Sequence, residues 1–161
     1  EAARQNLLNS GIVVDLGLPS GTLWCAKNEG GDYARYTYNE AVNKFGNKLP
    51  TKEQLEELKN QCTWTWGAQN GINGYTVTGP NGNSIFLPAA GRGDDGKGAD
   101  PYIGEEGSYW TSTMHSKDFD THDEALSFDF YIWGQGITLG GESCREKYRD
   151  IGNSVRPVMN R

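Results

Sequence analysis

The sequence is poor in cysteine and has no long hydrophobic run, and both absences exclude classes of protein. Its three cysteines are Cys25, Cys62 and Cys144, and their wide spacing excludes a zinc site of the Cys-x-x-Cys type. At least one thiol stays unpaired within a monomer, and both one disulfide and three free thiols remain open. Because no stretch approaches the roughly 18 to 20 apolar residues of a membrane-spanning helix, we expect no transmembrane segment.

Clustered basic residues and the familiar catalytic motifs are also missing. The chain has 15 Lys and Arg against 21 Asp and Glu, a formal net charge of −6. Phosphate contacts need clustered cations, so we expect no nucleic-acid partner. The sequence contains no serine nucleophile elbow, P-loop or His-Glu-x-x-His motif. These absences argue against the common hydrolase and nucleotide-binding classes.

Aromatic residues and glycine are what the sequence does offer. Hydrophobic residues make up 35% of the 161 positions, but 11% are aromatic and five are Trp, which supplies large areas for burial in a core. The 22 glycines indicate tight turns and irregular loops. This length suits one domain, and we expect a lead-in segment over 1–10 and a single domain over 11–161.

Two helices are predicted in the first half of the chain. Over 37–45 the apolar positions repeat at helical spacing, and Gly46 stops the helix. The stripe consists of Tyr38, Ala41, Val42 and Phe45. The second helix starts at Thr51, where Gln54 completes a capping box. Its buried seam is predicted to be Leu55, Leu58 and Cys62.

From residue 63 onward the pattern alternates with a period of two, which is typical of strands. Trp64 and Trp66 share one face, and Gly79-Pro80-Asn81-Gly82 predicts a hairpin turn. The expected strands are 12–16, 23–26, 63–66, 75–78, 84–87, 125–132, 137–139 and 155–158. Early helices followed by short antiparallel strands predict the α+β class. Between the strands lie three long loops, 91–107, 114–124 and 140–153, where we expect the binding site.

Several longer motifs resemble a known family. They are Val14–Trp24, Lys48–Leu55, Cys62–Trp66, Gly79–Gly91, Gly107–Thr113 and Asn153–Val158. Their order resembles a C-type-lectin-like domain, and within that fold the bacterial surface proteins of the Fibrobacter succinogenes major paralogous domain family. The resemblance implies that the strand at 12–16 lies beside a terminal strand at 154–159, and that the long loops gather on the opposite half of the domain.

The resemblance also implies a function. It suggests a non-enzymatic binding or adhesion module at the cell surface or outside the cell, within a lipoprotein or fimbria-like assembly. The expected partner is a glycan or protein ligand on a host or neighbouring cell. The loop residues expected to form the binding face are Arg92, Asp94, Asp95, Tyr102, Asp118, Asp120 and Trp133.

No cofactor is expected, although Ca²⁺ remains an alternative because the loop 91–100 is rich in carboxylates. Lectins of this fold commonly bind calcium through Glu-Pro-Asn or Gln-Pro-Asp and Trp-Asn-Asp triplets, which this sequence lacks. Imidazoles and carboxylates gather at His115, Asp118, Asp120 and His122, but their spacing matches neither a helical His pair nor an EF-hand loop. We therefore predict no metal site.

Two other functions remain open. Leu49-Pro50-Thr51 is similar to a helix start in the formylglycine-generating, sulfatase-modifying enzymes, but those enzymes need two neighbouring reactive cysteines and Cys144 has none nearby. Receptor-binding proteins diversified by retroelements also use this fold. They usually concentrate Asn and Tyr near the C-terminus, whereas 140–150 is charged. We predict that the protein is not an enzyme.

Overall fold

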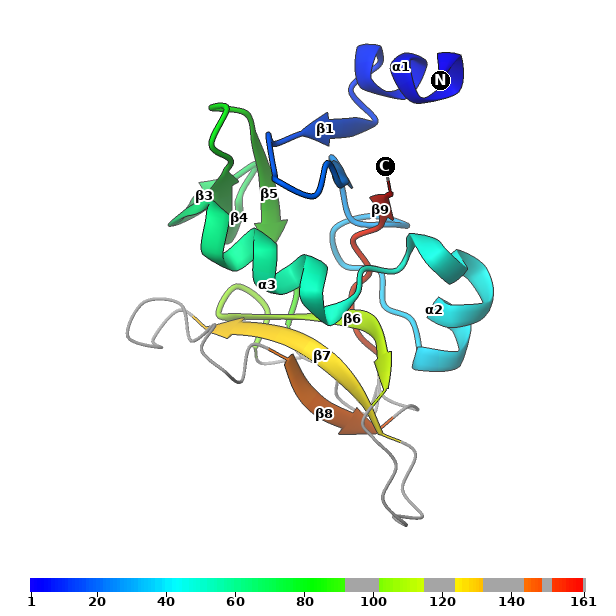
Figure 1. Cartoon of the computed structure of the whole chain (residues 1–161). Coiled ribbons are helices and arrows are strands. Elements are labelled where there is room, and N and C mark those ends of the chain that lie inside the picture. Colours follow the sequence, from blue (N-terminus) through cyan, green and yellow to red (C-terminus); the bar gives the residue numbers. More distant parts are fainter. Residues whose placement is uncertain (92–101, 115–123, 132–143, 149–151, 161) are drawn as a thin grey trace.

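The computed structural model describes residues 1–91, 102–114, 124–131, 144–148 and 152–160, with the backbone alone at 114, 124–125 and 144–148. Its elements in chain order are α1 (Ala2–Asn9), β1 (Val13–Asp15), β2 (Leu23–Cys25), α2 (Tyr38–Phe45), the 3₁₀ helix η1 (Gly46–Lys48), α3 (Lys52–Gln61), β3 (Thr63–Gln69), β4 (Ile72–Thr78), β5 (Ser84–Pro88), β6 (Glu106–Met114), β7 (Glu124–Tyr131), β8 (Cys144–Tyr148) and β9 (Val158–Met159). Figure 1 shows their arrangement.

The described strands form small antiparallel sheets, ordered β1-β2-β9, β3-β4-β5 and β6-β7-β8. In Figure 1 α3 lies between the sheets, with β3 to β5 on one side and β6 to β8 below it. Helices early in the chain and antiparallel strands later confirm the predicted α+β class.

The two ends of the chain meet in one sheet. Trp24 of β2 pairs with Val14 of β1 on one side and with Val158 of β9 on the other. The expectation that β1 itself lies beside the terminal strand is therefore wrong, because β2 separates them. The reason is local: a turn in which Gly21 N–H donates to the Leu18 carbonyl at 2.9 Å sends the chain straight back along β1.

The main hydrophobic core lies among these sheets and α3. Trp24 and Phe128 are fully buried in it, and Trp64 and Trp66 pack against it from β3. The other buried members are Leu16, Leu18, Leu55, Leu58, Tyr75, Val77, Ile85, Leu87, Ala89, Tyr109, Phe130 and Val158. A second cluster around Trp110 packs against α2 and contains Tyr38, Ala41, Phe45, Leu49 and Val155. Of the tryptophans predicted to fill the core, Trp24 and Trp110 are fully buried, whereas Trp64 and Trp66 are only partly buried at its edge.

Both predicted helices form, with small differences in what they bury. The capping box of Thr51 and Gln54 is present, and α2 starts with a second one that pairs Thr37 with Glu40. Val42 is 38% exposed, so its predicted place in the buried stripe is wrong. Cys62 follows the last residue of α3 and is only half-buried.

The strand predictions hold best where apolar residues alternate. The hairpin of β4 and β5 forms around the Gly-Pro-Asn-Gly turn, and β7 covers nearly all of the predicted 125–132. Residues 144–148 were expected to lie in a loop but form β8 on the edge of β7. Their sequence Cys-Arg-Glu-Lys-Tyr shows no apolar alternation and therefore did not predict a strand. Backbone pairing with β7 holds this charged edge strand, and such pairing needs no apolar side-chain pattern. The expected strand 137–139 lies outside the described residues.

Candidate functional site

Of the loop residues predicted to bind a ligand, only Tyr102 lies in the described part of the chain. Arg92, Asp94, Asp95, Asp118, Asp120 and Trp133 lie outside the described residues, as do the weak metal candidates His115 and His122. No group of three or more His, Cys, Asp or Glu that could hold a metal ion occurs among the described residues.

The segment Tyr102–Gly104 is firmly attached to the neighbouring sheet. Gly104 N–H donates to the Ala89 carbonyl at 2.7 Å, and the Asn73 side-chain amide donates to the Gly104 carbonyl at 3.2 Å. Between them Ile103 forms a bridge with Ala90. The Ile103 side chain is nevertheless 44% exposed, and Tyr102 is half-buried. A fixed backbone thus presents an aromatic and an aliphatic side chain at the start of β6.

The Pro80-Asn81 turn serves the fold. The side-chain amides of Asn81 and Asn83 donate to the Asp15 carbonyl at 2.8 and 2.9 Å. A side chain at Gly79 would overlap the backbone of Leu16. These contacts join the hairpin turn to the end of β1.

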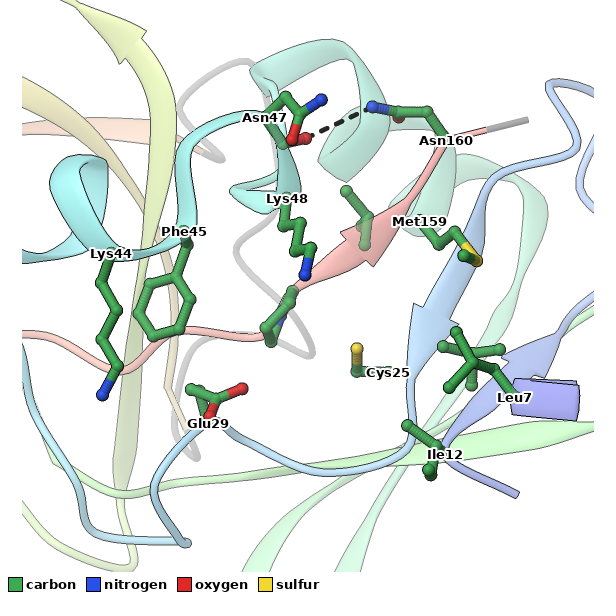
Figure 2. Close-up of a pocket in the computed structure, with 13 residues that line it drawn as sticks. Leu7, Ile12, Cys25, Glu29, Lys44, Phe45, Asn47, Lys48, Met159 and Asn160 are labelled. Atoms are coloured by element: carbon green, nitrogen blue, oxygen red, sulfur yellow. Dashed lines mark hydrogen bonds between the residues drawn. The ribbon is translucent and has the colours of Figure 1, made fainter. Parts of the chain in front are cut away.

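The described surface contains a pocket where the two ends of the chain meet, which we call the terminal groove. Its volume is about 540 Å³, and it lies between α1, the β1-β2-β9 sheet and the α2–η1 segment. It is lined by Leu7, Ile12, Val13, Cys25, Glu29, Lys44, Phe45, Asn47, Lys48, Pro157, Val158, Met159 and Asn160. Figure 2 shows the Cys25 sulfur pointing into it and Lys48 extending across it from η1. Asn160 donates to the Asn47 carbonyl at 3.3 Å along one rim.

Charges of both signs act on the Cys25 thiol inside the terminal groove. Burial is the largest effect and raises the thiol pKa; the Glu29 carboxylate also raises it, whereas the Arg156 guanidinium and the Lys48 amine oppose the shift. Since the net shift is upward, Cys25 stays protonated at neutral pH. The groove therefore holds a thiol of low nucleophilicity beside cationic groups.

Arg156 is buried and is bonded to the backbone of Cys25, one of the lining residues of the terminal groove. Its guanidinium donates to Asn28 Oδ1 at 2.9 Å, to the Cys25 carbonyl at 3.2 Å and to the Phe86 carbonyl at 2.5 Å. Asn28 in turn donates to the Tyr109 hydroxyl at 3.1 Å, which donates to the Pro88 carbonyl at 2.8 Å. All three acceptors of the guanidinium are neutral oxygens, so none of these hydrogen bonds neutralises its positive charge, which lies in a poorly hydrated region. Burial lowers the pKa of Arg156 and raises that of Tyr109 to about 12.

The thiol of Cys62, the second one that the structure describes, is also a poor nucleophile at neutral pH. Burial and the nearby Glu57 carboxylate raise the pKa of Cys62 to about 11. Cys25 and Cys62 are both free, and neither supplies a thiolate at neutral pH.

The terminal groove was missed by sequence reasoning. Its lining comes from residues 7 to 160, and nothing in the local pattern places Lys48 near Cys25. The structure shows Ile12 to be 54% exposed beside β1, and this uncovered apolar side chain could not be recognised from the strand pattern alone.

Comparisons with protein-family models, curated proteins and solved structures find no match to this chain. None of the described helices combines the length and apolar character that a membrane crossing requires.

Proposed function

We propose that the protein is a non-enzymatic binding or adhesion module of a bacterial surface or secreted protein, with a C-type-lectin-like organisation. Its ligand is a glycan or a protein, recognised by the face that carries the long loops. The observation that carries this proposal is the anchored segment Tyr102–Gly104, where a hydrogen-bonded backbone holds the half-buried Tyr102 beside the exposed Ile103. Side chains held on a rigid scaffold lose little freedom on binding, which favours recognition.

The described chemistry supports binding rather than catalysis. An enzyme of the formylglycine-generating type needs a reactive thiolate, and the raised pKa values of Cys25 and Cys62 make these two thiols unsuited to that role. The buried polar groups Asn28, Tyr109 and Arg156 bond to one another and to backbone carbonyls, as a structural network does.

The proposal is tested by binding of the whole chain to a glycan array and to host and neighbouring-cell surface proteins. Once a ligand is found, Tyr102→Ala, Ile103→Ala and Trp133→Ala should each weaken binding by about 1–2 kcal/mol, as contact residues often do. The melting temperature should change little. Tyr33→Ala is the matched control, since Tyr33 is 50% exposed on a different segment.

Unchanged affinity in all three loop-face variants would refute the proposed binding face. Turnover in hydrolase or thiol-oxidase assays that disappears in Cys144→Ser would refute the non-enzymatic function and support the enzyme alternative.

A further inference from the structure

The terminal groove has the form of a small-molecule site. Its volume of about 540 Å³ lies within the range of about 300–1,000 Å³ that is typical of ligand pockets. Val13, Phe45, Pro157 and Val158 are buried side chains that form apolar walls. Leu7 and Met159 are half-buried and Ile12 is exposed, so apolar surface continues to the opening. Such a lining favours an apolar ligand body.

The charges around the terminal groove favour an anion. Glu29 is the one carboxylate among the lining residues, against the amines of Lys44 and Lys48. The buried guanidinium of Arg156 lies behind Cys25 and is the strongest charge acting on its thiol. Two amines and one guanidinium thus outnumber the Glu29 carboxylate and the Asp32 carboxylate that acts on Arg156, although the whole chain carries a net charge of −6.

Lys48 is the amine best placed to meet that anion. The Lys44 amine lies 5.4 Å from the centre of the Tyr36 ring and 5.7 Å from that of Phe45, so aromatic faces already hold it. Lys48 reaches across the groove (Figure 2), and its amine forms no hydrogen bond or ion pair within the described part of the chain.

We propose that the terminal groove binds a small apolar monocarboxylate. The carboxylate lies at the Lys48 amine, in the field of Arg156, and the apolar chain lies along Leu7, Ile12 and Met159. The groove lining shares no residue with the segment Tyr102–Gly104, and the proposal does not depend on the function proposed above.

The probe set consists of decanoate, decanol and decylammonium, which share an apolar chain and differ in the charge of the head group. Calorimetric titration of the whole chain should show saturable one-to-one binding of decanoate, weaker binding of decanol and the weakest binding of decylammonium. Equal affinities for the three probes, or binding of none of them, would overturn the proposal.

Variants separate the head-group contact from the apolar contact. Lys48→Gln should weaken decanoate binding about tenfold, the effect expected for losing one charged contact, and leave decanol binding unchanged. Lys59→Gln on α3 is the matched control and should retain wild-type affinity. Ile12→Ser should weaken decanoate and decanol alike, whereas Ile103→Ser, which changes an exposed isoleucine outside the groove, should weaken neither. If Lys48→Gln binds decanoate as well as the wild type does, the proposal is wrong.

Cys25 provides an internal reporter of occupancy. At an alkaline pH, where a fraction of each thiol is ionised, decanoate should slow alkylation of Cys25 by N-ethylmaleimide, measured site by site by mass spectrometry, but leave alkylation of Cys62 unchanged. Equal protection of both thiols would indicate non-specific binding and overturn the assignment.

Sedimentation of the unliganded chain tests the competing occupant: a dimer that dissociates in Ile12→Ser and resists decanoate would show that a second copy fills the groove. Tyr102→Ala should bind decanoate with wild-type affinity. A failure of the binding face proposed at Tyr102 can therefore be distinguished from a failure of the terminal groove to bind a carboxylate.

Discussion

At the scale of single residues, the buried network of Arg156, Asn28 and Tyr109 dominates the interior chemistry. Arg156 donates to the Cys25 and Phe86 carbonyls, and Tyr109 donates to the Pro88 carbonyl. Each of these hydrogen bonds satisfies an acceptor that would otherwise be buried without a partner. The network therefore specifies how three distant segments meet. Its cost is that the charged guanidinium of Arg156 is held away from water, where burial lowers its pKa, and that Tyr109 must keep its proton.

Tyr109 makes the folded protein sensitive to alkali. Its pKa rises from 10.0 to about 12 on folding, mainly through burial, so its stabilising contribution is complete below pH 10. Between pH 10 and about 12 the unfolded chain loses the tyrosine proton and the folded chain keeps it, so the free energy of unfolding should fall by about 1.4 kcal/mol per pH unit. Urea denaturation at a series of alkaline pH values measures this slope.

Tyr109→Phe should reduce the alkaline slope, while it lowers stability at neutral pH by about 1–3 kcal/mol because the Pro88 carbonyl loses its donor. Tyr33→Phe, a change at an exposed tyrosine, should keep the wild-type slope. A Tyr109→Phe variant with the full slope would show that other groups cause the alkaline sensitivity.

At the scale of elements, α3 is the helix that connects the sheets. Its N-terminus is tied to β6, where the register shifts between Trp110 and Met114. There Lys52 N–H donates to Thr113 Oγ1 at 3.1 Å, and Ser112 N–H donates to the Pro50 carbonyl at 2.8 Å. The irregular end of β6 thus satisfies backbone groups around the helix start that would otherwise have no partner.

The capping box of α3 should have a measurable effect on stability. Thr51→Ala removes the hydroxyl that accepts from Gln54 N–H at 3.1 Å, and we expect a loss of about 1 kcal/mol in the free energy of unfolding. Thr51→Ser keeps the hydroxyl and should stay close to the wild type in urea denaturation. Equal losses in the two variants would mean that the threonine methyl group, not the cap, is responsible.

At the scale of the whole molecule, segments from the two ends of the chain are held as one unit. Cys25 N–H donates to the Pro157 carbonyl at 3.0 Å, Trp110 N–H to Ser154 at 3.0 Å and Asn153 N–H to Tyr36 at 2.9 Å. By contrast, α1 buries none of its residues completely. We therefore expect the N-terminal helix to open without disturbing this closure.

Native-state hydrogen exchange tests this division. The amides of Cys25, Trp110 and Asn153 should exchange with free energies within about 1 kcal/mol of one another, near the global value, because only complete unfolding breaks these bonds. The Gln5 and Ser10 amides of α1 should exchange through local opening at clearly lower free energy. Protection of α1 equal to that of Trp110 would contradict the predicted independence of the first ten residues.

The sequence by itself determined the parts that depend on neighbouring residues. Period, caps and turn residues act within a few positions, so the starts of α2 and α3, the β4–β5 hairpin and the burial of Trp24 and Trp110 were all readable. The edge strand β8 was not, because backbone pairing with β7 holds it and its side chains show no apolar pattern. Only the tertiary structure decided that β2 separates β1 from β9, and that Arg156 bonds to a carbonyl 131 positions away in the chain. It likewise assembled Cys25, Lys48 and Met159 around one groove, since burial and electrostatic fields depend on distance in space and not on separation along the chain.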